Sequence, residues 1–209
     1  VSDGSGSDRA LLRRADDMFR AAGCKREGNV LKLPNGQPFE IEFLDSQGAL
    51  QPHTQPFQAN LKRLGISATS RIVDAAQYQR RLDEFDFDII SRALGGSAIP
   101  SDSLRIVYGS EAARTRGSRN VGGVSHPAID AMIEAIGQAD SYAEVVVAAK
   151  CLDRILRAGR YWIPMWWNPT EWLAYWDMFE RPQTKPKYGS GAPAIWWYDA
   201  DKAKRIGKA

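Results

Sequence analysis

Residues 84–110, EFDFDIISRALGGSAIPSDSLRIVYGS, contain an apolar run that stops abruptly at two glycines. The run from Phe87 to Leu94 has the length of a strand and little polar alternation, which is typical of a strand covered on both faces. Gly95 and Gly96 then permit the backbone to pass close to another group. Because ligands of open α/β sheets bind at the carboxyl ends of strands, we expect a binding site beside this loop, although a plain turn after a core strand has the same pattern.

The segments before this strand predict a parallel βαβ unit. Residues 66–73 have the composition of a strand, and Asp74 follows as the cap of a helix whose apolar stripe runs to Phe85. Strand, helix and strand with short connections predict parallel pairing with a right-handed crossover. We expect an α/β fold in which the strand within residues 87–94 is central to the sheet.

The N-terminal part predicts a helix followed by a hairpin. Asp8 is placed to cap the helix, whose apolar residues recur at helical spacing. Residues 30–33 and 39–44 flank a Pro-Asn-Gly turn and predict the two strands of a hairpin. Glu40 and Glu42 alternate with apolar residues there, so solvation of one strand face explains this carboxylate pair better than catalysis does.

The chain beyond the two glycines predicts a long surface excursion and then two helices. Residues 95–124 are rich in Gly, Ser, Arg and Asn, with one short helix expected near residues 102–107. Long ordered loops are often functional. Pro127 is expected in the first turn of the first helix, and Ser141 with Glu144 has the spacing of a capping box for the second. The short link between these helices predicts an antiparallel hairpin.

All seven tryptophans lie between residues 162 and 197. Trp166 and Trp167 are adjacent, so on a strand they would face opposite sides, and one of them would leave the core and suit a binding groove. Residues 180–194 are rich in Pro, Lys and Gly and predict an irregular strap after an aromatic strand pair. We expect packing in a core or a domain interface for the remaining early members of the group, which are Trp162, Trp172 and Trp176.

The totals indicate one large or two small domains that bury their own core. The 209 residues include 28 Lys and Arg against 25 Asp and Glu, and a net charge of +3 is too small to predict nucleic acid or an anionic membrane as partner. No apolar run reaches the ~20 residues of a membrane span, and no signal peptide is visible. Residues 1–8 have the composition of a linker within something longer. Cys24 and Cys151 are expected as small core residues rather than as a disulfide or metal pair.

The sequence offers little for catalysis. His53 and His126 are the only imidazoles, neither has zinc-type spacing, and His126 precedes a helix start, where capping explains it better than catalysis. Nucleophile-elbow, phosphate-loop and dinucleotide motifs are absent. Two carboxylates that meet only in space would escape sequence analysis, so a glycosidase-type hydrolase stays an alternative. We expect no enzyme activity, no cofactor and no metal.

Taken in order, the segments resemble the C-terminal half of the family 5 extracellular solute-binding proteins, in particular their YejA-type branch, which is associated with oligopeptide and microcin C uptake. The resemblance covers nearly the whole chain and is carried by LLRRADDMFRAAGC, PFEIEFL, FQANLKRLGISATSRIVDAAQYQRRLDEFDFDII, YGSEAARTRGSRNVGGVSHPAIDAMIEAI, LDRILRAGRYWIPMWW and YWDMFERPQTKPKYGSGAPAIWWYDADKA.

This resemblance implies the C-terminal lobe of a type II periplasmic-binding-protein fold, with a mixed sheet flanked by helices. Residues 9–168 would form the ligand-binding lobe, and residues 169–209 a strap that returns to the N-terminal lobe. It also implies a periplasmic receptor that delivers oligopeptides to the permease of an ABC importer. A receptor for peptidoglycan fragments or oligosaccharides is the alternative.

The resemblance also places ligand contacts at the glycine loop and the aromatic segment. Many members of the family hold the peptide ammonium with an acidic residue after this strand, but glycines occupy the neighbourhood here, and Asp102 is the nearby substitute. Arg92 could instead meet a ligand carboxylate bidentately, or lie exposed at the strand end. The candidate site residues are Arg92, Leu94, Gly95, Gly96, Ser97, Asp102, Trp166 and Trp167.

Overall fold

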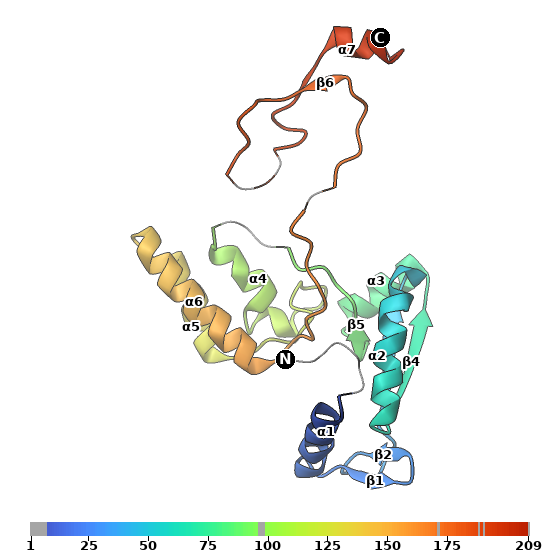
Figure 1. Ribbon diagram of the computed structural model, residues 1–209. Helices are drawn as coiled ribbons and strands as arrows, with labels where there is room; N and C mark the ends of the chain where they lie inside the picture. Colours follow the sequence, from blue (N-terminus) through green and yellow to red (C-terminus); the bar gives the residue numbers. More distant parts are fainter. Residues whose placement is uncertain (1–7, 96–98, 171, 188, 190, 209) are drawn as a thin grey trace. The chain divides into compact units, whose positions relative to one another are not determined.

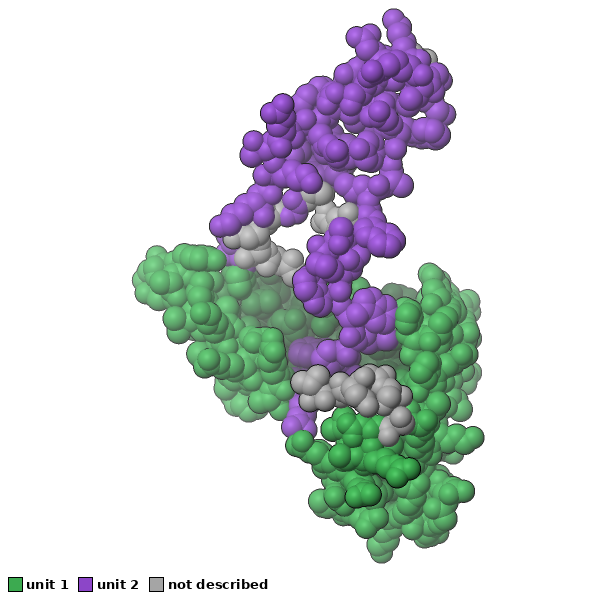
Figure 2. All heavy atoms as spheres, in the orientation of Figure 1, with its two compact units in different colours: residues 1–96, 100–159 green, residues 97–99, 160–209 purple. Residues whose placement is uncertain are grey.

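The computed structural model describes residues 8–95, 99–170, 172–187, 189 and 191–208. The chain forms two compact units, which are coloured separately in Figure 2. Unit 1 comprises residues 1–96 and 100–159, and unit 2 comprises residues 97–99 and 160–209. Residues 1–7 of the expected linker lie outside the described residues. The expected boundary between lobe and strap, after residue 168, stays a prediction about the whole protein.

Unit 1 holds most of the regular structure (Figure 1). Its elements are, in chain order, α1 (Arg9–Ala21), β1 (Lys25–Glu27), β2 (Val30–Lys32), β3 (Glu40–Asp45), the 3₁₀ turn η1 (Gly48–Leu50), α2 (Gln51–Arg63), β4 (Ser67–Ile72), α3 (Ala75–Asp83), β5 (Ile89–Ile90), η2 (Asp102–Leu104), α4 (Arg105–Tyr108), η3 (Ala112–Arg114), α5 (Pro127–Gly137) and α6 (Tyr142–Gly159).

The helix starts follow the predicted caps. The Asp8 carboxylate accepts hydrogen bonds from the first amides of α1, and Asp74 accepts from the Gln77 amide at the start of α3. His126 caps α5 through Nδ1, which accepts from the Ala128 amide. These caps satisfy amides that have no partner within their helices, so local sequence was sufficient to predict them.

The main sheet has three parallel strands in the order β4-β3-β5. Parallel pairing is as predicted, but the expected central position of the strand within residues 87–94 is wrong. Only Ile89 and Ile90 are in strand conformation, and they lie at an edge beside Phe43 and Leu44 of β3. The Asp88 carboxylate accepts a hydrogen bond from the Glu42 amide, so a side chain replaces the next backbone pairing. α2 covers one face of β3, where the rings of Phe57 and Phe43 lie 6.0 Å apart.

The hairpin prediction is right about the turn and wrong about the partner strand. β2 pairs with β1, and its link to the next segment is a single bridge between Lys32 and Pro38. β3 instead pairs in parallel with β4, and Pro38 has no amide hydrogen to extend an antiparallel ladder. The core beneath this turn contains Cys24, Leu31, Ile66 and the partly buried Phe19, Leu33, Phe39, Ile41, Leu61 and Leu64.

The loop before α5 is fixed from within by Asn120, which is 1% exposed. Its side-chain Nδ2 donates to the carbonyls of Gly109 and Val124, and its Oδ1 accepts from the Val124 amide at 2.9 Å. α5 and α6 then pack together as the predicted helix hairpin, with Ile129 and Ile133 buried. The excursion is therefore an ordered loop with its own polar anchor.

Unit 2 contains β6 (Phe179–Glu180), which pairs antiparallel with β7 (Trp197–Tyr198), and α7 (Ala200–Arg205). The strand expected at Trp166 and Trp167 is absent from the described part of unit 2, where both residues lie in irregular chain. Core packing is also wrong for two of the early tryptophans, Trp172 and Trp176, which are exposed. Their packing in a domain interface stays a prediction.

Both cysteines are free, as predicted; Cys24 is buried and Cys151 is partly buried. Within the described ranges, no helix combines the length and apolar character that crossing a bilayer requires. The same ranges contain no group of three His, Cys, Asp or Glu side chains arranged to hold a metal ion.

Candidate functional site

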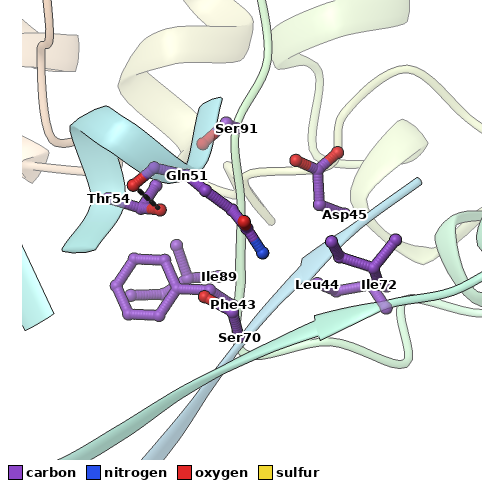
Figure 3. Close-up of a pocket in the computed structure, with 9 residues that line it drawn as sticks. All are labelled: Phe43, Leu44, Asp45, Gln51, Thr54, Ser70, Ile72, Ile89 and Ser91. Carbon is purple, nitrogen blue, oxygen red and sulfur yellow. Dashed lines mark hydrogen bonds between the residues drawn. The ribbon is translucent and has the colours of Figure 1, made fainter. Parts of the chain in front are cut away.

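The carboxyl ends of the three parallel strands meet the start of α2 at one edge of the sheet (Figure 3). A cavity of about 10 Å³ lies between them, which is room for about one water molecule. Its lining comes from β3, β4, α2, β5 and the residue after β5, and consists of Phe43, Leu44, Asp45, Gln51, Thr54, Ser70, Ile72, Ile89 and Ser91.

The polar groups around this strand-end cavity are anchored locally. Asp45 Oδ1 accepts hydrogen bonds from the amides of Ser46 at 2.7 Å and Gln47 at 3.1 Å, which turns the chain away from β3. The Ser70 hydroxyl accepts from the Gln58 side chain at 2.7 Å. The cavity walls are therefore preformed before any ligand enters.

Three charged or polar side chains interact around this strand-end edge. Burial raises the pKa of the Tyr78 phenol, the negative charge of Asp45 raises it further, and the positive charge of Arg92 lowers it. Tyr78 lies on α3, Asp45 ends β3, and Arg92 follows β5. A carboxylate and a guanidinium from two other elements therefore both act on the phenol of Tyr78.

The predicted glycine-loop residues lie in irregular chain after β5. Arg92, Leu94 and Gly95 are exposed, while Gly96 and Ser97 lie outside the described residues. A Cβ atom added to Gly95 would meet no atom of the described chain within 4 Å. Close approach at Gly95 therefore stays a prediction that concerns a ligand or another part of the protein.

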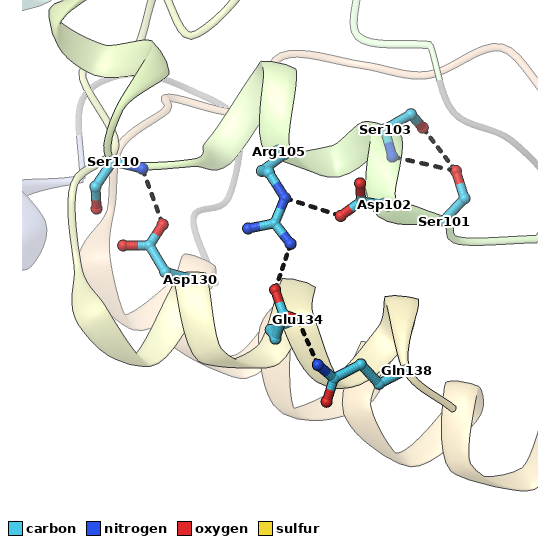
Figure 4. Close-up of polar contacts among 8 residues, drawn as sticks. All are labelled: Ser101, Asp102, Ser103, Arg105, Ser110, Asp130, Glu134 and Gln138. Atoms are coloured by element: carbon cyan, nitrogen blue, oxygen red, sulfur yellow. Dashed lines mark hydrogen bonds and ion pairs between the residues drawn. The ribbon is translucent and has the colours of Figure 1, made fainter. Parts of the chain in front are cut away.

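Asp102 belongs to a separate ionic network (Figure 4). Its Oδ1 accepts from Arg105 Nε at 2.8 Å, and Arg105 Nη2 also donates to Glu134 on α5. Gln138 donates to the other oxygen of Glu134. Because Arg105 already compensates the charge of Asp102, this carboxylate is a weaker candidate for an ammonium than its sequence position indicates.

The predicted tryptophans lie in unit 2, whereas Arg92 and Asp102 lie in unit 1. Trp167 is 79% exposed and Trp166 is 59% exposed. Large exposed apolar side chains that adjoin one another in the chain indicate a surface that another group covers.

Sequence analysis missed Asp45 and Tyr78 as candidate site residues. Asp45 is the first polar residue after the apolar end of EIEFLD, a signal that the carboxyl-end rule could have used. Tyr78 belongs by its spacing to the apolar stripe of the helix that ends near Phe85, and no local signal distinguishes a site residue from a member of that stripe.

Relatives of the chain are binding proteins about three times as long. A protein of Brucella melitensis is 40% identical over 198 residues, which cover 95% of this chain and 32% of that protein. The "Probable peptide-binding protein YejA" of Agrobacterium fabrum is 37% identical, over 94% of this chain and 32% of its own length. The "Peptidoglycan-binding protein YepA" of the same organism is 34% identical with the same coverage. No family model matches the chain.

Solved structures share the fold at lower identity. The oligopeptide-binding protein AppA of Bacillus subtilis, in complex with a nonapeptide, has a TM-score of 0.68 and 15% identity over 89% of this chain and 37% of its own. A periplasmic oligopeptide-binding protein of Thermotoga maritima, bound to mannohexaose, has a TM-score of 0.63 and 23% identity over 75% and 31%. The chain is therefore similar over nearly its whole length to the YejA-type binding proteins, spans about a third of their length, and has the fold of type II periplasmic binding proteins.

Proposed function

We propose that the chain is the ligand-binding lobe of a periplasmic receptor that captures oligopeptides for an ABC importer. The observation that carries this proposal is the match of 94% of the chain to the A. fabrum protein named as peptide-binding. Capture and release require no covalent chemistry, in keeping with relatives that are binding proteins. The same fold binds other ligands in other proteins, so the ligand class has to be argued from the site.

The strand-end edge has the groups that a peptide needs. β5 is an edge strand of the described sheet, so its free side offers backbone donors and acceptors to an extended peptide. Arg92 follows β5 and would meet a peptide carboxylate, and Asp45 would meet an ammonium or a backbone amide. We propose these two residues as the polar ends of the site, with Leu94, Gly95, Gly96 and Ser97 beside the peptide backbone.

The exposed aromatic residues of unit 2 are suited to pack against another part of the whole protein. We propose that Trp166, Trp167 and Trp172 pack against the N-terminal lobe or line the ligand cleft that the two lobes enclose. The closed receptor would then dock on the permease subunits in the membrane. Closure of two lobes buries a ligand from both sides, so this lobe alone should bind weakly.

Calorimetric titration of a mixed oligopeptide pool into the natural full-length protein tests the proposal. We expect Arg92→Ala to weaken peptide binding by about tenfold, because a charge-assisted hydrogen bond is lost. Arg13→Ala is the matched control, since Arg13 is an exposed arginine on α1, away from the strand-end residues. Unchanged affinity in Arg92→Ala would remove Arg92 from the site, and a full-length protein blind to peptides would overturn the peptide proposal.

A receptor for peptidoglycan fragments is the second candidate, favoured by the A. fabrum relative named as peptidoglycan-binding. Such fragments combine a sugar with a short peptide, and exposed tryptophans suit sugar rings. Titration with muropeptides, with the same peptides without sugar, and with oligosaccharides separates the candidates. Tighter binding of muropeptides than of both other ligands would favour the second candidate.

A further inference from the structure

A second and larger hollow lies on unit 1 between the edge strand β4 and helix α3. Its volume is about 270 Å³. Every residue that lines it is charged or an amide, and the set is Arg71, Gln77, Arg80, Arg81, Glu84 and Asp86. None of these residues lines the strand-end cavity. We call this hollow the arginine groove.

Arg81 is a fixed wall of the arginine groove. Its side chain is 15% exposed and is held at both ends of the guanidinium group. Nη1 donates to Glu42 at 2.8 Å, while Nε donates to the backbone carbonyl of Asp86 at 2.8 Å and pairs with its carboxylate at 2.9 Å. Glu42 is therefore an internal ion-pair partner rather than the solvated residue expected from the alternation of its strand. The hydrogen bond to Glu42 raises the pKa of Arg81, so this cation stays charged.

The carboxylates of the groove are already compensated. Asp86 pairs with Arg81, and Glu84 pairs with Arg116 at 2.8 Å. Glu42 is shared between Arg81 and Arg71, but the nitrogen of Arg71 lies 3.6 Å away, beyond a good hydrogen bond. Four guanidinium groups therefore meet three carboxylates, which leaves a net positive charge in the groove.

Two arginines keep donors available to a ligand. The Arg71 side chain is 58% exposed, and its ion pair within the described residues is the long contact to Glu42. Arg80 is exposed, and within the described part of the chain it has no ion pair. The planar guanidinium group binds carboxylate and phosphate oxygens bidentately, and two such groups from different elements can hold one oxyanion between them.

We propose that the arginine groove binds a small polar organic anion whose carboxylate or phosphate lies between Arg71 and Arg80. The volume exceeds that of an inorganic oxyanion, and the Gln77 amide with the nearby carboxylate oxygens suits hydroxyl groups on the rest of the ligand. The absence of apolar side chains from the lining excludes an apolar ligand. Because this groove shares no residue with the strand-end cavity, the proposal does not depend on the nature of the transported ligand.

Nuclear magnetic resonance titration of the full chain tests the proposal, with arginine Nε–Hε signals as the readout. The probes are glucose 6-phosphate, inorganic phosphate and uncharged glucose, each at low ionic strength. We expect glucose 6-phosphate to shift the Arg71 and Arg80 signals in a saturable way, inorganic phosphate to bind more weakly at the same signals, and glucose to have no effect. Arg80→Gln should weaken binding of glucose 6-phosphate by about tenfold.

Arg13→Gln is the matched control, because it removes the same charge from an exposed site on α1. It should leave the affinity unchanged. Equal loss of affinity in Arg13→Gln and Arg80→Gln would show attraction by net charge alone and would overturn the proposal. Absence of a saturable shift of Arg71 and Arg80 with either phosphate probe would also overturn it. Arg80 is exposed, so its replacement leaves the fold intact, and native dispersion in the variant spectrum checks this.

Discussion

The compact unit and the terminal unit differ in where their large side chains lie. In unit 1 apolar residues of α5, α6 and β3, such as Ile129, Leu152 and Leu44, are buried, and even a polar residue, Asn120, is buried with its hydrogen bonds satisfied. In unit 2 Trp166, Trp167 and Trp172 are exposed, although tryptophan is the residue with most to gain from burial. Unit 1 therefore contains its own core, whereas unit 2 leaves large aromatic side chains exposed.

The difference shows that aromatic content is a poor guide to a core. Unit 2 holds all seven tryptophans, but the regular structure among its described residues amounts to two short strands and one short helix. Its internal contacts are centred on Trp196, whose ring lies 4.6 Å from that of Tyr175 and 6.4 Å from that of Phe179. Two others also have contacts within unit 2, since Trp162 packs on Tyr161 and the Trp176 ring lies 4.3 Å from Lys208 Nζ.

The largest test of this comparison replaces a buried side chain of unit 1 and an exposed one of unit 2. Leu31→Ala should lower the free energy of unfolding by about 4 kcal/mol, because it leaves a cavity in a packed core. Trp172→Ala should change it by less than about 0.5 kcal/mol, since Trp172 is 85% exposed. Urea unfolding followed by circular dichroism, which reports mainly the helices of unit 1, measures the effect of Leu31→Ala, and tryptophan fluorescence measures that of Trp172→Ala.

Tryptophan fluorescence in the same titrations observes unit 2 alone, because every tryptophan lies there. Leu31→Ala should shift the dichroism transition to lower urea and leave the fluorescence transition in place. A common shift of both transitions would contradict independent stabilisation of the two units. A large loss of stability in Trp172→Ala would place Trp172 in a core after all.

Elements whose signals are local were predicted well. The caps at Asp8, Asp74 and His126 and the turn before β3 depend on residues within a few positions of one another. The pairing of helices α5 and α6 was also predicted, because the short link between them permits few other arrangements.

Elements that depend on distant partners were not predicted. The apolar run of residues 87–94 has the composition of a central strand, but Asp88 bonds to the Glu42 amide and the strand ends after two residues. Glu42 alternates like a solvated residue, but Arg81, 39 positions later, pairs with it. Neither contact leaves a signal in the neighbouring sequence.

The candidate site was predicted in the same partial way. The carboxyl-end rule located the loop with Arg92 and Gly95, and that loop does follow a strand of the parallel sheet. The same rule holds for β3, which ends in Asp45, but no site residue was predicted at the end of that strand. The aromatic signal at Trp166 and Trp167 indicated that one of them would be exposed, and both are.

A second test concerns how closely the backbone at Gly65 packs against the backbone of a neighbouring segment. Gly65 has φ +82°, and a Cβ there would lie 2.7 Å from the Leu31 nitrogen. Gly65→Ala should cost about 3 kcal/mol, from the left-handed conformation and from the overlap with the backbone. Gly207 in unit 2 has φ +68° and nothing within 4 Å, so Gly207→Ala should cost about 1 kcal/mol or less.

The two dihedral angles are similar, so the difference between these variants measures the close packing of unit 1. Gly28→Ala is the control within unit 1, since Gly28 has φ +57° and open space around it. Gly28→Ala should lower the free energy of unfolding by about as much as Gly207→Ala does. Thermal unfolding of the three variants provides the comparison, and equal losses in Gly65→Ala and Gly28→Ala would show that the turn conformation alone accounts for the effect.

The smallest expected effect is a difference in how alkaline pH lowers the stability of the two units. Burial is the main cause that raises the pKa of Tyr78 in unit 1, and a hydrogen bond to Glu180 is the main cause that raises the pKa of Lys202 in unit 2. In both cases the folded state holds its proton more tightly than the unfolded state. Each contribution is therefore present below the unfolded pKa, near 10 for tyrosine and 10.5 for lysine, and is lost as pH rises through the higher folded value.

Salt distinguishes the two causes. The partners of Lys202 are exposed, Asp177 by 72% and Glu180 by 39% of their side chains, so about 1 M NaCl should screen these pairs and return the pKa of Lys202 toward the ordinary value. Burial of Tyr78 is not screened, so its raised pKa should persist. Side-chain carbon chemical shifts followed through alkaline pH at low and high salt measure both groups. If the Tyr78 titration moved with salt as far as that of Lys202, charges rather than burial would govern it, and the two units would hold their protons by the same means.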